Sequence, residues 1–170
     1  DLCCNMSGAF QLKIRRMTQE DIPSVRHVAE VTWHHTYKNI IPEHIRTEFL
    51  ATAYSDKSLN YRMRNNVLLV VEDAGHLVGF AEFTPLQDSS EVELSAIYIL
   101  PSHQGKGIGT QLLQEGIKNF PDAKVIKLRV ESRNAPAKSF YLAKGFLPTR
   151  EYTILIHGYS CEITEMEKHL

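Results

Sequence analysis

The chain has 170 residues, of which 43% are hydrophobic and 23% charged, a length and balance that suit one domain with a buried core. Nineteen Lys and Arg against twenty Asp and Glu give a formal net charge of -1, without the basic excess that nucleic-acid binding requires. No apolar run approaches the roughly 20 residues that span a bilayer, and no charged-then-apolar export signal is present, so we expect a cytoplasmic protein without nucleic-acid or membrane partners.

The first predicted elements are a strand and a helix. Residues 1–5 precede a Met-Ser pair that is typical of a natural start, so we expect them to be a non-native or disordered leader and 6–170 to form a single domain. Alternating apolar and polar residues over 10–16 predict a strand. Thr18, with Asp21 three positions later, predicts a helix start, and apolar residues at helical spacing continue it to Trp33.

Two shorter helices and three strands are predicted after the first helix. One helix opens at Pro42 and the other runs from Ser58 towards Arg64. The β-rich runs 67–71 and 77–83, separated by an Asp-Ala-Gly turn, predict a hairpin. A further long strand is predicted over 91–100.

The last third alternates helices and strands. An apolar stripe predicts an amphipathic helix over 104–120, ending before a proline. A strand over 125–131 and a helix over 135–144 come next. The runs 152–156 and 161–166 predict a final hairpin that turns at a His-Gly pair.

The stretch 97–110 is the most informative, because a strand leads through a glycine-rich turn directly into a helix. Free amide groups at a helix start bind phosphate, and glycines allow a close backbone approach. The spacing differs from a P-loop, since Leu100 stands where its first glycine is required. It also differs from a Rossmann turn, because Gly105, Gly107 and Gly109 run G-x-G-x-G.

Two motifs resemble those of the GNAT superfamily of N-acetyltransferases. Gln104-x-x-Gly107-x-Gly109 resembles its Q/R-x-x-G-x-G/A signature, and the run from Asn134 to Phe146 resembles its N-x-x-A-x-x-F-Y-x-x-x-G-F element. The resemblance implies an α/β GNAT fold, with a mixed six- to seven-stranded sheet flanked by about four helices, and acetyl-CoA as co-substrate. It implies these cofactor-binding positions: Ile97, Tyr98, Ile99, Gln104, Gly105, Lys106, Gly107, Ile108, Gly109, Thr110, Asn134 and Tyr141.

The same resemblance implies a base and an acid. An ammonium with a pKa near 10.4 needs help to lose its proton at pH 7. Glu93 matches where some family members place a general-base carboxylate, and Glu91, two residues away, faces the same side. A solvent-exposed glutamate at a strand end is the alternative reading. Tyr141 matches the family's general acid, which hydrogen-bonds or protonates the leaving thiolate.

The residues that would bind the amine, which accepts the acetyl group, are less clearly indicated by the sequence. Family members form part of the pocket for the acceptor amine at the end of the first helix, which here carries Trp33, His34, His35 and Tyr37, and Glu91 is a further substrate-side candidate. His34 and His35 are adjacent, point in different directions on a helix and have no carboxylate at i+4, so we expect no metal site. Short strings around 54–59 and 93–99 resemble bacterial spermidine/spermine N-acetyltransferases of the PaiA type.

Several alternatives remain open. The acceptor could be a polyamine or another small amine, an aminoglycoside, an amino acid, a protein N-terminus or a lysine. The chain could instead sense acetyl-CoA without turnover. The cysteines, Cys3, Cys4 and Cys161, match neither a disulfide framework nor a zinc spacing, and Cys161 is expected to pack in the core. The last hairpin could add strands across a partner, which is compatible with a homodimer.

Overall fold

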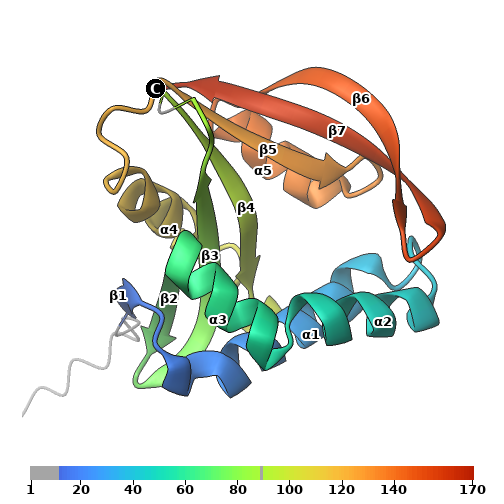
Figure 1. The fold of residues 1–170 in the computed structure, drawn as a ribbon, viewed down its shortest axis with the longest axis horizontal. Helices are drawn as coiled ribbons and strands as arrows, with labels where there is room; N and C mark the ends of the chain where they lie inside the picture. The colour runs from blue at the N-terminus through green and yellow to red at the C-terminus, as the bar shows by residue number, and fades with distance from the viewer. Residues whose placement is uncertain (1–11, 89) are drawn as a thin grey trace, which may run out of the picture.

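The computed structural model describes residues 12–88 and 90–170, which form one seven-stranded sheet with helices on both faces (Figure 1). The strands are β1 (Leu12–Arg16), β2 (Val67–Asp73), β3 (His76–Pro85), β4 (Glu91–Ile99), β5 (Val125–Glu131), β6 (Leu147–Ile156) and β7 (Tyr159–His169). The α-helices are α1 (Ile22–Tyr37), α2 (Glu43–Ala53), α3 (Asp56–Asn65), α4 (Ile108–Ile117) and α5 (Ala135–Ala143). Two short 3-10 helices, η1 (Gln19–Asp21) and η2 (Pro101–His103), precede α1 and follow β4.

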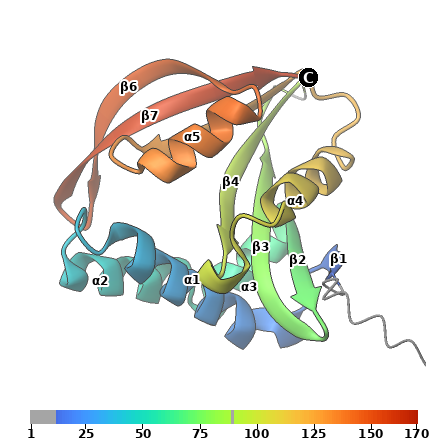
Figure 2. The same ribbon diagram turned by 180° about the vertical axis from the view of Figure 1, so that it is seen from behind.

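The sheet is mixed and opens in its middle. Its strand order is β1-β2-β3-β4-β5-β7-β6, and every neighbouring pair is antiparallel except β4 with β5. These two central strands pair only from Glu91–Leu94 to Val125–Leu128. Beyond Leu94 they separate, so the sheet has two halves that diverge from a shared end (Figures 1 and 2).

A bulge in β4 lies beside the point of separation. Glu82 pairs with Ala96 and Phe83 with Leu94, so Ser95 is an extra residue relative to β3. Side chains of a strand alternate between its two faces, and one extra residue reverses that alternation. The bulge therefore changes which β4 side chains share a face on either side of Ser95.

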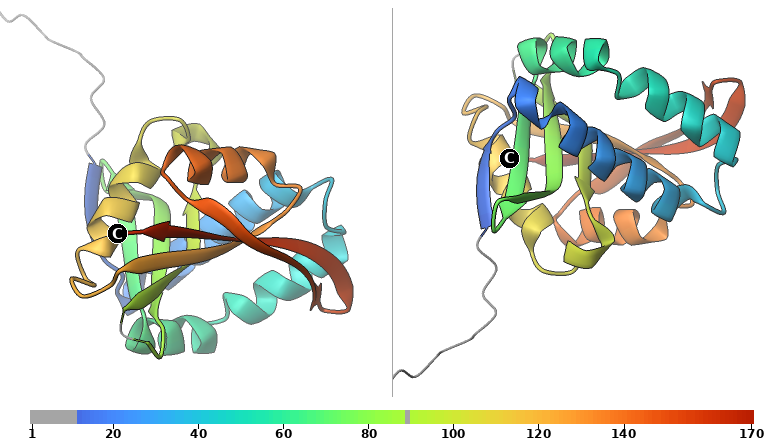
Figure 3. Two further views of the ribbon diagram at one scale, coloured as in Figure 1. Left: turned by 90° about the horizontal axis from the view of Figure 1, so that it is seen from above. Right: turned by 90° about the horizontal axis from the view of Figure 1, so that it is seen from below.

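Two hydrophobic clusters occupy the two faces of the sheet. Helices α1, α2 and α3 pack on one face, around Trp33, Leu59 and Phe80, while α4 packs on the other, around Phe83 and Leu112 (Figure 3). A Cβ added at Gly116 in α4 would lie 1.9 Å from the Phe83 ring. Glycine at this position lets α4 approach the sheet closely.

The predicted order of elements is confirmed, with seven strands and five α-helices among the described residues. Positions 10 and 11 of the first predicted strand and the expected leader lie outside the described residues. The helix predicted over 104–120 is shorter, because Gly105 and Gly107 adopt positive φ angles of 75° and 80° and α4 begins only at Ile108. No helix within 12–88 and 90–170 is long and apolar enough to cross a membrane.

Candidate active site

The turn between β4 and α4 presents backbone groups rather than side chains to its surroundings. Gly107, the N-cap of α4, has a φ of 80°, and a Cβ there or at Gly105 would meet no atom within 4 Å. The Gln104 side chain folds back, and its Nε2 donates to the Ile99 carbonyl at 2.9 Å. The turn is thus held open at the positive end of the α4 dipole, which suits a phosphate group.

A cavity of about 700 Å³ extends from this turn between α5 and α1. The family-implied positions that line it are Ile97, Tyr98, Ile99, Gln104, Gly105, Gly107, Ile108, Gly109, Thr110, Asn134 and Tyr141. Lys106 alone among the implied cofactor positions is not part of this lining. The separation of β4 from β5 leaves the backbone of residues 95–99 without a partner on β5, so an extended ligand could lie along it.

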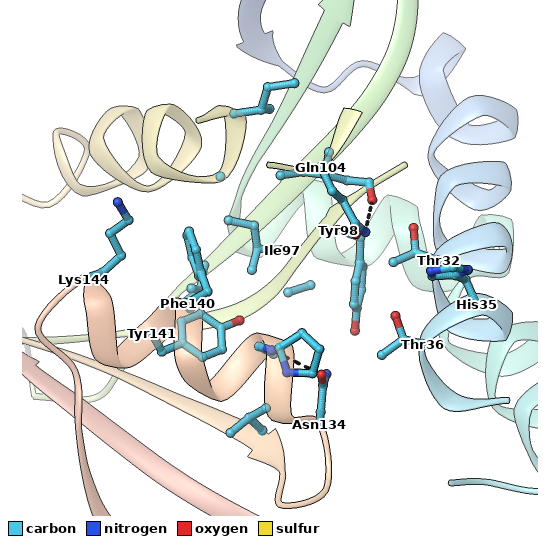
Figure 4. Close-up of a pocket in the computed structure, with 18 of the residues that line it drawn as sticks. Thr32, His35, Thr36, Ile97, Tyr98, Gln104, Asn134, Phe140, Tyr141 and Lys144 are labelled. Carbon is cyan, nitrogen blue, oxygen red and sulfur yellow. Dashed lines mark hydrogen bonds between the residues drawn. The ribbon is translucent and has the colours of Figure 1, made fainter. Parts of the chain in front are cut away.

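Helix α5 supplies one wall of this first cavity (Figure 4). Asn134 caps the helix, its Oδ1 accepting a hydrogen bond from the Ala137 backbone N–H at 3.3 Å. Phe140 and Tyr141 line the cavity beyond it, and the Lys144 ammonium lies 5.7 Å from the centre of the Phe140 ring. The opposite wall carries Thr32, His35 and Thr36 of α1, at the i, i+3, i+4 spacing of one helix face.

A second cavity of about 220 Å³ is lined by α1, α2, the central strands and the β6–β7 hairpin. Aromatic and aliphatic side chains make up most of its wall: Trp33, Tyr37, Phe49, Tyr98, Ile41, Leu94, Ile154, Ile156 and Ile163. Two carboxylates, Glu93 and Glu131, also line it. The two cavities share Tyr37, Leu94, Ser95, Tyr98 and Arg129, so they meet where β4 leaves β5.

Each candidate carboxylate faces a basic group. Glu93 Oε1 lies 3.2 Å from Arg129 Nη2, and Glu91 Oε2 lies 3.0 Å from Lys127 Nζ. The Glu91 side chain lines neither cavity, so the structure separates it from the acceptor-side candidates Trp33 and Tyr37. Glu131 accepts hydrogen bonds from the backbone N–H and the Nε of Arg133, which hold the turn that leads into α5.

Three phenols surround the junction of the cavities. Burial raises the pKa values of Tyr37 and Tyr98 above the ordinary phenol value, and it raises that of Tyr141 in the same way. All three are therefore neutral at physiological pH. A neutral phenol can donate a proton or a hydrogen bond, as the removal of a thiolate requires.

The structure also reveals residues that the sequence analysis missed. Arg129, Glu131, Phe49, Thr32 and Thr36 line the cavities without having been selected, whereas His35, in the same α1 row as Thr32 and Thr36, was expected to line the pocket. The helical spacing of the α1 row could have pointed to Thr32 and Thr36. Arg129, Glu131 and Phe49 come from distant segments, and no pattern in the sequence pointed to them. No group of three or more His, Cys, Asp or Glu side chains within residues 12–88 and 90–170 is arranged to hold a metal ion.

Comparison with known proteins identifies relatives of the same architecture. Residues 31–146 match the family described as Acetyltransferase (GNAT) family. The spermidine N(1)-acetyltransferase of Thermoplasma acidophilum is 29% identical over 145 residues, which cover 81% of this chain and 89% of that protein. The uncharacterised N-acetyltransferase YuaI of Bacillus subtilis is 32% identical over 106 residues, 61% of each chain. The crystal structure of the PaiA N-acetyltransferase from Thermoplasma acidophilum in complex with coenzyme A has a TM-score of 0.83 and 25% identity, covering 94% of this chain and 99% of that one.

Proposed function

Because the chain belongs to the acetyltransferase (GNAT) family, it is an acetyl-CoA-dependent N-acetyltransferase, and we propose that its acceptor is a small primary amine of the polyamine class. The observation that carries this proposal is the meeting of two cavities of different chemistry. The first has a phosphate-binding turn and an unpaired strand, and the second has aromatic walls with two carboxylates. Their shared residues would bring an acetyl thioester and an amine together without a covalent enzyme intermediate.

The composition of the second cavity supports a cationic acceptor with an aliphatic chain. Trp33 and Phe49 stack with ring centroids 4.1 Å apart, and aromatic faces attract ammonium groups. Glu93 and Glu131 supply negative charge on the same wall. The positive charge of Arg129 partly offsets this negative charge. The Arg129 side chain is 54% exposed, however, so it can turn into solvent when an ammonium approaches Glu93. The relative that acetylates spermidine supports the same class of acceptor.

The proposed chemistry divides the proton transfers between the two cavities. Glu93, in the second cavity, takes the amine proton directly or through water as nitrogen attacks the acetyl carbon. The C–S bond then breaks, and Tyr141, in the first cavity, hydrogen-bonds or protonates the departing thiolate. The products are an N-acetylated amine and free coenzyme A.

A direct test is the release of coenzyme A thiol from acetyl-CoA with spermidine, spermine, amino acids, aminoglycosides and peptides as acceptors. We expect turnover with polyamines at a kcat/KM at least tenfold above that of the other acceptors. Preference for a peptide N-terminus or an amino acid would overturn the polyamine proposal. Binding of acetyl-CoA without turnover of any amine would indicate a sensor.

A further inference from the structure

The Tyr98 side chain crosses the junction of the two cavities. It lines both of them, and Figure 4 shows it projecting from β4 between the α1 wall and the Tyr141 side. Trp33 Nε1 lies 3.0 Å from the Tyr98 hydroxyl oxygen. An indole N–H can only donate, so the Tyr98 oxygen is the acceptor in this bond. The hydroxyl proton of Tyr98 must then point in another direction.

Neither hydrogen bond that residues 12–88 and 90–170 make with this hydroxyl takes its proton, because the bond with Tyr54 lowers the pKa of Tyr98 and so also ends at the Tyr98 oxygen. Thr32 Oγ1, buried in the same cavity wall, has no hydrogen-bond partner among these residues, so it does not receive the proton. Burial raises the pKa of the Tyr98 phenol, and the hydrogen bonds with Trp33 and Tyr54 offset this rise only in part. Tyr98 therefore keeps its proton at physiological pH, while Trp33 and Tyr54 hold its oxygen in place.

We propose that Tyr98 is a catalytic residue whose hydroxyl donates a hydrogen bond to the acetyl carbonyl oxygen, and that Trp33 is the positioning residue that orients it. The inference rests on the proposed function above and adds to it a side-chain donor for the oxyanion. Donors fixed in a water-poor site before reaction stabilise developing negative charge strongly. Tyr98 meets this requirement because its ring packs against Phe80, with centroids 5.5 Å apart, and its oxygen is held by Trp33.

The step balances without a further reactant. The amine nitrogen forms a bond to the acetyl carbon, and the carbonyl π electrons move to oxygen, where the Tyr98 O–H stabilises them without giving up its proton. When the electrons return, the C–S bond breaks and the thiolate leaves. The amine proton goes to the base in the second cavity, and the thiolate gains one from the acid in the first.

The test compares Tyr98→Phe and Trp33→Phe with the wild type in the thiol-release assay. Tyr98→Phe keeps the ring and removes only the hydroxyl, and we expect kcat to fall about 100-fold, as it does when one oxyanion donor is lost. The KM for the amine and the affinity for coenzyme A, which has no acetyl carbonyl, remain within twofold. Tyr61→Phe, on the exposed surface of α3, is the matched control with unchanged kcat.

The second variant separates positioning from packing. Trp33→Phe keeps an aromatic ring against Phe49 but removes the N–H, so kcat falls about tenfold in the wild-type background and does not fall further when Tyr98→Phe is already present. Unchanged kcat in Tyr98→Phe, or additive effects of the two substitutions, would overturn the inference. If the wild type turned over no amine, the proposed function itself would fail, a result distinct from either.

Discussion

Glu93 of β4 forms an ion pair with Arg129 of β5, at 3.2 Å between Oε1 and Nη2, just where the two strands separate. Both side chains line the second cavity, and Arg129 also lines the first. If Glu93 is the base, as proposed, an incoming ammonium would have to displace this partner.

Replacement of Glu93 with Gln is expected to lower kcat about 100-fold at pH 7, because the bound ammonium loses its local proton acceptor. The deficit narrows as pH rises towards the pKa of the amine, where the free base is supplied by solvent. The pH dependence of kcat in wild type and variant measures this. Arg129→Gln is the matched control: it frees Glu93, so the KM for a cationic amine falls, and a rise in that KM would argue against competition.

Removal of the Tyr141 hydroxyl in Tyr141→Phe is expected to lower kcat about 100-fold with little change in the KM for acetyl-CoA. Loss of assistance to the departing thiolate is the reason. A thioester with a more acidic thiol, which leaves as a stable anion, should restore much of the rate to the variant. Equal loss with both thioesters would show that the hydroxyl does not act on the leaving group.

Alkaline pH is expected to destabilise the fold. Burial raises the pKa values of Tyr37, Tyr54 and Tyr141, so above about pH 10 these phenols ionise in the unfolded chain while they stay protonated in the native state. Their stabilisation is complete below pH 10 and is lost as pH rises, at up to about 1.4 kcal/mol per pH unit for each phenol. Denaturant unfolding at pH 8, 10 and 11 tests the sign, and a free energy of unfolding that does not fall would contradict it.

Gly107→Ala is expected to raise the KM for acetyl-CoA at least tenfold. Its φ of 80° is strained for alanine by about 1–2 kcal/mol, so the turn would relax and move its amide groups. Gly75→Ala is the matched control, because Gly75 has a φ of 84°, has equally open surroundings and lies in the β2–β3 turn. The two variants should lose similar stability in thermal unfolding, and only Gly107→Ala should lose affinity for the cofactor.

Gly116→Ala is expected to destabilise the protein by about 1–3 kcal/mol, the usual cost of overpacking a core. The added Cβ would lie 1.9 Å from the Phe83 ring, which is fully buried. Denaturant unfolding measures the loss, and Phe83→Leu in the same chain should recover part of it by making room. If the double variant instead loses as much stability as the two single variants added together, the Phe83 ring is not what the added Cβ displaces.

Local patterns in the sequence determined the order of the elements and the glycine-rich turn between β4 and α4. The turn depends on consecutive residues, since the positive φ angles at Gly105 and Gly107 and the start of α4 at Ile108 are properties of one short segment. The placement of Asn134 and Tyr141 is also local, because they lie seven residues apart around α5 and both line the first cavity. The roles given to these residues stay predictions, but their placement required little beyond helical and glycine geometry.

Only the tertiary structure decided which side chains line the cavity proposed to hold the acceptor. Strict alternation along β4 would place Glu93 and Tyr98, five residues apart, on opposite faces, yet the extra residue Ser95 brings them into one cavity. The partner of Glu93, Arg129, is 36 residues away and reaches it through the parallel register of β4 and β5. A bulge and a strand register are set by packing between distant segments, so no local pattern contains them.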